Sequence, residues 1–396
     1  TNINKDGYMN YDDLIYISEK LGDSLSKTQV SNGDIVVSQR GSLGQCAIVD
    51  DSFPKMNISA NIIAIKNING VSVSFLHDYF LSTVGQTLLE RSVSGQVQSK
   101  ITTQDIADLL IPVNTDETKL TDLLDSAYKS YKRKLQQADK LQRKNPTYLI
   151  ERLGLTSDYS ETQKLTYATT AGSIEGRIDA DYYSPKFSHF RSQIEALPYH
   201  TVSVDDISEK IVSGFAAGKQ DQADNLPEDQ RVPHLRPFSI TPEGELSFET
   251  KKYVPKSRLK SEDYCKKNEV IFNNTNSPDL VGKTTVFDSD VLCAASNHMT
   301  RITVKEGVNP YYVAAFFNVL LSIGYWKLLC TNFNNQAGVN TDTLKRVKIP
   351  LPPKEIQDQI AAELMQRRSQ ANVLRRQAIK EWADAKAQFE KELLGE

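Results

Sequence analysis

Two short motifs in this sequence contain parts of catalytic sites, and both are incomplete. Val281-Gly282-Lys283-Thr284 has the ending of a phosphate-binding loop, but Ser277 stands where such a loop needs its first glycine. Asn145-Pro146-Thr147-Tyr148 and Asn309-Pro310-Tyr311-Tyr312 have the asparagine, proline and tyrosine of an adenine-methylating site without its second proline. We therefore expect Lys283 to face a DNA phosphate from a turn. We expect the two Asn-Pro segments to be helix or strand boundaries.

The other reactive residue types show no catalytic spacing. The five histidines have no metal-ligand spacing with cysteine or acid, and no serine stands in a Gly-x-Ser-x-Gly turn. The four cysteines fit neither a CxxC motif nor a disulfide framework, which predicts reduced thiols. We expect a chain without catalysis, metal or cofactor of its own, and this favours a binding protein.

Another group of polar residues has the chemistry of DNA recognition. Arg and Lys bind guanine edges, Asn and Gln bind adenine edges, and Lys, Arg, Ser and Thr bind phosphates. Such residues stand in loops that correspond between the two halves of the chain. The candidates in the first half are Gln39, Arg40, Ser42, Gln96, Gln98, Ser99 and Lys100. Those in the second half are Lys219, Arg236, Asn273, Asn274, Thr275, Asn276, Lys283, His298, Asn334, Asn335 and Gln336.

Length and composition are those of an ordinary soluble protein with room for two or more cores. The chain has 396 residues, 39% of them hydrophobic and 24% charged, and no run of eighteen apolar residues. We expect a cytoplasmic protein without a membrane span. A net charge of −3 argues against nucleic acid, but an acidic helical arm can coexist with a basic groove elsewhere.

The elements that must position the candidate residues form two copies of one plan. Gly33-Asp34-Ile35-Val36 in the first copy corresponds to Asn268-Glu269-Val270-Ile271 in the second. The copies end in strands closed by Pro112 and Pro350, and the repeat unit is about 240 residues long. Because the second copy has an opening part that the first lacks, we expect the first domain to be incomplete at its start.

A long amphipathic helix follows each copy. In residues 114–155 and 352–396, apolar side chains recur at three- and four-residue steps and leave the other faces polar. A single apolar stripe suits a helix–helix pair, and about 35 helical residues reach roughly 50 Å. Residues 156–174, rich in Ser, Thr, Gln and Ala, are typical of a connector.

This order of elements, which occurs twice along the chain, resembles that of the specificity subunit of type I restriction–modification systems. The matching residues are Gly33-Asp34-Ile35-Val36 with Arg40-Gly41 and Gly44, the opening from Arg177 to Pro185, and Ile349-Pro350-Leu351-Pro352-Pro353. The resemblance implies an α/β (α+β) fold. Two target-recognition domains would alternate with two long antiparallel coiled-coil helices in a pseudo-two-fold repeat. The domains would be residues 1–113 and 175–351, the helices 114–155 and 352–396, and the linker 156–174.

The resemblance also implies a function. Each recognition domain would read half of a split target in double-stranded DNA, and the helices would set the spacing and dock two methyltransferase subunits. A restriction–translocase subunit could join, with S-adenosylmethionine and ATP bound only by these partners. Two departures are Val113-Asn114 after Pro112, where the second copy has a double proline, and Asn268-Glu269 in place of Gly-Asp. Two alternatives stay open: the C-terminal specificity region of a fused adenine methyltransferase or restriction enzyme, and a coiled-coil scaffold for other proteins.

Overall fold

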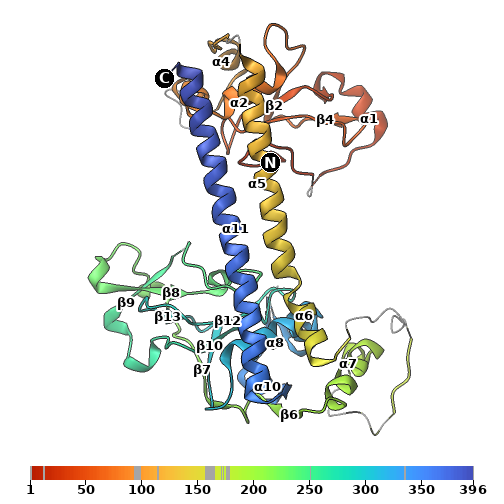
Figure 1. The fold of residues 1–396 in the computed structure, drawn as a ribbon, viewed down its shortest axis with the longest axis vertical. Helices are drawn as coiled ribbons and strands as arrows, with labels where there is room; N and C mark the ends of the chain where they lie inside the picture. The colour runs from red at the N-terminus through yellow and green to blue at the C-terminus, as the bar shows by residue number, and fades with distance from the viewer. Residues whose placement is uncertain are drawn as a thin grey trace. The chain divides into compact units, whose positions relative to one another are not determined.

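The computed structural model divides the chain into two compact units that share two long helices (Figure 1). Unit 1 is Thr1–Gln136 with Val373–Glu396, and unit 2 is Gln137–Asn372. Helices α5 (Glu117–Arg143) and α11 (Lys354–Leu394) each contribute residues to both units. The structure describes residues 2–11, 14–92, 100–113, 116–156, 166–170, 172, 174, 179–249, 251–333 and 336–395, without the side chains of Ser92 and Phe333.

The core of unit 1 is a small antiparallel sheet in the order β3-β2-β5. Its central strand β2 (Ile35–Ser38) is buried along its whole length, as expected of three consecutive β-branched residues between two neighbouring strands. Ile35, Val37 and Phe80 belong to the same apolar cluster under the helices. The other elements are α1 (Glu19–Ser24), β1 (Gln29–Val30), β3 (Cys46–Ile48), β4 (Met56–Asn57), β5 (Ile62–Ile65), α2 (Val73–Leu81), α3 (Thr83–Ser92) and α4 (Thr103–Ala107).

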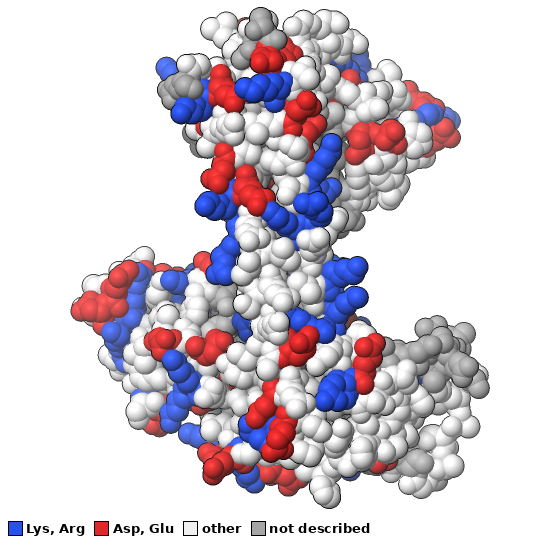
Figure 2. All heavy atoms as spheres, viewed as in Figure 1, with Lys and Arg blue, Asp and Glu red and all other residues white. Residues whose placement is uncertain are grey.

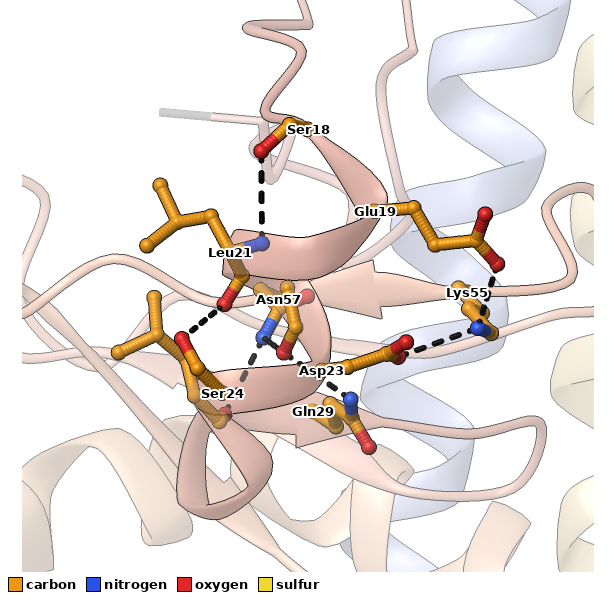
Figure 3. Close-up of polar contacts among 10 residues, drawn as sticks. Ser18, Glu19, Leu21, Asp23, Ser24, Gln29, Lys55 and Asn57 are labelled. Atoms are coloured by element: carbon orange, nitrogen blue, oxygen red, sulfur yellow. Dashed lines mark hydrogen bonds and ion pairs between the residues drawn. The ribbon is translucent and has the colours of Figure 1, made fainter.

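Helix α1 is held to this unit by polar contacts (Figure 3). The Ser18 hydroxyl caps the helix by accepting from the backbone N–H of Leu21. The Asn57 amide donates to the carbonyl oxygens of Gly22 (3.3 Å) and Leu25 (3.2 Å). Lys55 pairs with Glu19 on the first turn of the helix. These side chains therefore form contacts within unit 1.

In unit 1 the two long helices run antiparallel and in contact. Lys119 near the start of α5 pairs with Glu392 near the end of α11 (3.0 Å), whereas Lys134 further along α5 pairs with Glu381. Between these pairs lies an apolar contact, the helix seam, which also receives Phe75 of α2. The predicted antiparallel helices are confirmed. The helix seam consists of Leu120, Leu124, Tyr128, Trp382, Ala385 and Phe389.

Unit 2 is built on a four-stranded antiparallel sheet in the order β12-β10-β14-β7. Helix α8 (Pro310–Ser322) covers it, with Phe272, Phe317 and Trp326 packed edge to face in the core. The sheet strands are β7 (Ser208–Ser213), β10 (Val270–Asn273), β12 (Thr284–Val286) and β14 (Met299–Val304).

Smaller sheets and short helices complete unit 2. The sheets are ordered β13-β8-β9, β11-β16-β15 and β17-β6. Their strands are β6 (His200–Ser203), β8 (Arg231–Leu235), β9 (Tyr253–Pro255), β11 (Thr275–Asn276), β13 (Ala294–Ala295), β15 (Thr331–Phe333), β16 (Gln336–Gly338) and β17 (Lys348–Leu351). The helices are α6 (Asn145–Leu153), α7 (Pro185–Glu195), α9 (Tyr325–Leu329) and α10 (Thr341–Arg346).

Both Asn-Pro segments begin helices, as predicted. Pro146 lies in the first turn of α6, where a missing N–H costs no hydrogen bond. Asn309 caps α8, and its side-chain oxygen accepts from the backbone N–H groups of Tyr311 (2.9 Å) and Tyr312 (3.3 Å). The mixed α/β class predicted from the sequence is confirmed. Among the described residues, no helix is both long and apolar enough to cross a membrane.

The helix seam predicts a contrast between two apolar truncations. Leu120 is 2% exposed in the seam, whereas Ile379 on α11 is 59% exposed. Leu120→Ala should lower the free energy of unfolding by about 2–5 kcal/mol, because it leaves a cavity. Ile379→Ala should change it by less than about 0.5 kcal/mol. Urea unfolding of both variants checks this, and equal losses would contradict the seam.

Candidate nucleic-acid interface

Five segments of unit 2 are joined to one another by hydrogen bonds, two of which go to the carbonyl oxygen of Phe215. Its carbonyl oxygen accepts from the backbone N–H of Asn297 (3.1 Å) and lies 3.3 Å from Nε2 of His234. The N–H of Asn274 donates to the His298 carbonyl (3.0 Å), and the Asn274 carbonyl accepts from Val339 N–H (2.9 Å). We call this the loop cluster; it comprises residues 213–219, 234–239, 273–277, 296–298 and 336–339.

The glycine at the start of the loop cluster is required by a close backbone approach. A Cβ on Gly214 would stand 2.2 Å from the carbonyl oxygen of Ala295 and 2.3 Å from that of Ser296. Only glycine lets the segment at Phe215 reach the backbone of the neighbouring loop. In the sequence, Ser213-Gly214 is typical of a polar loop, and the sequence alone does not show which backbone this loop approaches.

Asn274 joins two segments of the loop cluster with its side chain. Its amide nitrogen donates to the Asn297 carbonyl (3.2 Å) and to Thr300 Oγ1 (2.9 Å). Its amide oxygen accepts from Thr275 Oγ1 (2.8 Å). Since both ends of the side chain are engaged and it is only 8% exposed, Asn274 shapes the loops around it.

Lys283 and Asn273 point into unit 2, although we expected both in the DNA-reading set. Lys283 is 6% exposed, and its ammonium donates to the Ile240 carbonyl oxygen (2.6 Å). Burial lowers the pKa of this amine. Asn273 is fully buried and donates to the Leu280 carbonyl (3.3 Å). Lys283, which we expected to face a DNA phosphate, therefore faces a protein carbonyl instead, and its side chain is not on the surface.

The other described candidates of unit 2 keep their side chains at the surface. Lys219, His298 and Gln336 are exposed, and Arg236, Thr275 and Asn276 are half-buried. The loop cluster also exposes two residues that the sequence reading missed, Asn297 and Phe238, the latter 47% exposed beside Arg236. An aromatic face and an amide next to Arg, His and Gln can meet base edges and sugars. For Phe238, the only indication in the sequence was the Pro-Phe-Ser turn after Arg236.

His234 sits beneath this surface as a neutral residue. Burial, followed by the charge of Arg236, lowers the pKa of His234 to about 4. Its ring packs edge to face on Phe215, with centroids 6.2 Å apart. A neutral imidazole can donate to the Phe215 carbonyl and keep its place under the loops without a buried charge.

In unit 1, the corresponding loop joins β2 to β3 and carries Arg40 at its tip. Arg40 and Ser42 are exposed, and the loop turns through Gly41 and Gly44, which have φ of +78° and +73°. Gln86 fixes its far end by donating to the Gly44 carbonyl (3.0 Å). An arginine on a short, anchored loop has the stiffness that reading a base requires.

Lys100 reaches the same place from another segment. Ile101 N–H donates to the Gln39 carbonyl (3.2 Å), which brings exposed Lys100 beside half-buried Gln39. Unit 1 thus brings the segment of Lys100 to the loop that carries Gln39, Arg40 and Ser42. The remaining candidates, Gln96, Gln98, Ser99, Asn334 and Asn335, lie outside the described residues.

Neither a metal cluster nor a phosphate-binding loop is formed by these elements. Within the described ranges, no three His, Cys, Asp or Glu side chains gather as metal ligands. Gly282 packs against the Trp326 ring, and Thr284 begins strand β12. A phosphate-binding loop would lead into a helix instead. The geometry offers hydrogen-bond donors and acceptors held on rigid loops, which is the chemistry of recognition.

Comparison with known proteins finds a family that this segment is similar to. Residues 198–381 match the family model of the type I restriction modification DNA specificity domain. The matched segment contains the loop cluster, and the resemblance predicted from the sequence is confirmed by this match. A relative from Methanocaldococcus jannaschii, named as a type I restriction enzyme MjaX specificity subunit, is 29% identical over 109 residues. The match covers 26% of this chain and 26% of the relative's length.

Three solved structures align with most of the chain. The S subunit from M. genitalium shares 9% identity over 91% of this chain and 83% of its own, with a TM-score of 0.47. The HsdS subunit from Thermoanaerobacter tengcongensis shares 14% identity over 98% and 88%, with a TM-score of 0.37. A chain from a structural study of the type I R-M system shares 14% over 92% and 82%, with a TM-score of 0.46.

The neutral state of His234 predicts a loss of stability in acid. The unfolded histidine titrates near 6.5 and the folded one at about 4, so the unfolded chain binds the extra proton between these values. Stability should be complete above pH 6.5 and fall as the pH drops toward 4. Between pH 7 and 4.5, protonation of this histidine in the unfolded chain should lower the free energy of unfolding by about 2 kcal/mol. Urea unfolding should show that His234→Gln removes this part of the pH dependence while His200→Gln, at an exposed histidine, does not.

The inward position of Lys283 predicts that it matters for folding. Lys283→Met keeps the length of the side chain but leaves the Ile240 carbonyl without its donor, at a cost of about 1–3 kcal/mol. Lys219→Met, at an exposed lysine, should leave stability within about 0.5 kcal/mol. Thermal unfolding of the two variants checks this. A Lys283→Met protein as stable as the parent would show that its ammonium faces solvent.

Proposed function

We propose that the chain is the DNA-sequence specificity subunit of a type I restriction–modification system and reads a bipartite target in double-stranded DNA. Residues 1–113 and 175–351 would be the two target-recognition domains, and 114–155 and 352–396 the spacer helices. The observation that carries the proposal is the loop cluster, which presents Lys219, Arg236 and His298 from a DNA specificity domain. The Arg40 loop of unit 1 supplies a second reading surface of the same kind.

Partners would supply the chemistry. Two methyltransferase subunits would dock on the spacer helices and bind S-adenosylmethionine, and restriction–translocase subunits would bind ATP. The chain itself would neither methylate nor cleave DNA. The proposal is supported by the recognition chemistry of the loops and by the family of residues 198–381. The alternative, a specificity region fused to an adenine methyltransferase, differs in where the catalytic domain is encoded.

Separate half-sites are the most direct consequence. Arg40→Ala should relax the base preference in one half-site by about 1–3 kcal/mol if the guanidinium grips a guanine in two hydrogen bonds. His298→Ala should relax the other half-site alone, because His298 belongs to the loop cluster of unit 2. Sequencing methylated adenines in host DNA for each variant measures both halves at once.

Two outcomes would decide against the two-reader proposal. One is a single substitution that changes both halves of the methylated sequence. The other is methylation by the purified chain alone, which would favour the fused enzyme. Lys20→Ala, at an exposed lysine on α1, serves as the control and should leave both half-sites unchanged.

A further inference from the structure

The charge along helix α5 is strongly segregated. Its first turns, residues 116–125, are acidic, whereas residues 126–143 contain one acid, Asp139, among many basic residues. Figure 2 shows Lys and Arg side chains gathered along the middle of this helix. The basic residues of this stretch are Lys129, Lys132, Arg133, Lys134, Lys140 and Arg143.

Three of these side chains, which we call the basic stripe, lie on the part of α5 that belongs to unit 1. Lys129, Lys132 and Arg133 are exposed, and none of them forms an ion pair with any described residue. Lys132 lies over the Tyr128 ring, 5.7 Å from its centroid. Arg133 adds to the positive charge around Glu381, whose pKa is lowered first by its hydrogen bond from Lys134. Because Glu381 already pairs with Lys134, the positive charge of the basic stripe is not neutralised by it.

The basic stripe places like charges at neighbouring positions on one face of the helix. Lys129 and Arg133 are four residues apart, and like charges at this spacing repel by a few tenths of a kcal/mol. At other positions on the long helices this spacing joins opposite charges, as in Lys354–Asp358 (2.6 Å) and Glu363–Arg367 (2.7 Å), whereas Arg376 and Lys380 on α11 repeat the like-charge spacing. A row of exposed cations that form no ion pair with the described residues is expected where a polyanion binds.

We propose that Lys129, Lys132 and Arg133 bind the phosphate backbone of the DNA that separates the two half-sites. This inference rests on the proposed function. Side chains one helical turn apart are displaced by about 6 Å along the axis, close to two base-pair steps, so successive cations can follow one strand. Such contacts carry no sequence information, which suits a spacer whose bases are not read.

The outer surface of α5 is a poorer fit to a protein partner. The exposed residues beside the stripe, Asp125, Ser126, Gln136 and Gln137, are all polar, and lysine is depleted at protein interfaces, whose centres are apolar. α11 differs, because Val373 (39%) and Ile379 (59%) are exposed near Arg376 and Lys380. Arg376 and Lys380 therefore provide a matched control pair: two exposed cations four residues apart on the other long helix of unit 1.

The test compares Lys129→Gln/Arg133→Gln with Arg376→Gln/Lys380→Gln. Each protein is purified with its bound partners from the host, and binding to a duplex carrying the methylated target is measured across salt concentrations. The slope of log affinity against log salt should fall by about 1.8 for the α5 pair, since each lost phosphate contact removes about 0.9. The α11 pair should leave the slope unchanged. The sequence methylated in host DNA should be the same for both variants.

A second measurement locates the contact on the DNA. Methylphosphonate linkages, which carry no charge, replace phosphates of the spacer; they should weaken binding of the parent protein and have no further effect on the α5 pair. An unchanged slope for the α5 pair, or an equal fall for the α11 pair, would overturn the inference. Loss of a copurifying partner with an unchanged slope would identify the stripe as a protein-docking surface. A parent protein without a bipartite target would overturn the proposed function itself.

Discussion

The contact on which the rest of the molecule depends is the packing of α5 against α11. The two helices are far apart in the sequence; Ser130 and Glu381, 251 residues from one another, are within 3.4 Å. Closing so long a loop costs conformational entropy, which the burial of Tyr128, Trp382 and Phe389 offsets. Removing the seam would therefore separate the two helices within unit 1.

A second constraint acts inside unit 2, where polar residues divide into two groups with different tasks. Asn274 and Lys283 donate hydrogen bonds to backbone carbonyl groups of neighbouring loops and so fix the loop conformation. On the same loops, His298 is exposed and Arg236 is half-buried. Reading a base pair needs both groups, since a donor can discriminate only when its position is fixed before DNA arrives.

The sequence predicted the fold better than the interface, for a physical reason. Long-range order followed from the apolar stripe that recurs on each long helix. The prediction of a strand closed by proline was wrong for the first copy, since no strand ends at Pro112 within the described residues 100–113, and in the second copy Pro350 lies inside strand β17. The Arg40 loop was also predicted, because flanking glycines allow little besides a tight, exposed turn.

The side chains of the second domain were harder to assign. Lys283 follows a polar turn in the sequence, and only the position of the Ile240 carbonyl decides that the lysine points inward. Asn297 gave no signal, because its exposure depends on the approach of Gly214 to the neighbouring loop. Which polar residues face outward is a property of tertiary contacts, and neighbours in the sequence do not encode it locally.

The central claim is that two rigid reading surfaces on one chain recognise two separate half-sites. Selection of bound duplexes from a random pool, using the chain with its bound partners, tests it most directly. The account predicts two short invariant sequences separated by a fixed number of unspecified base pairs. A single continuous invariant sequence, or two half-sites at freely varying distances, would contradict it.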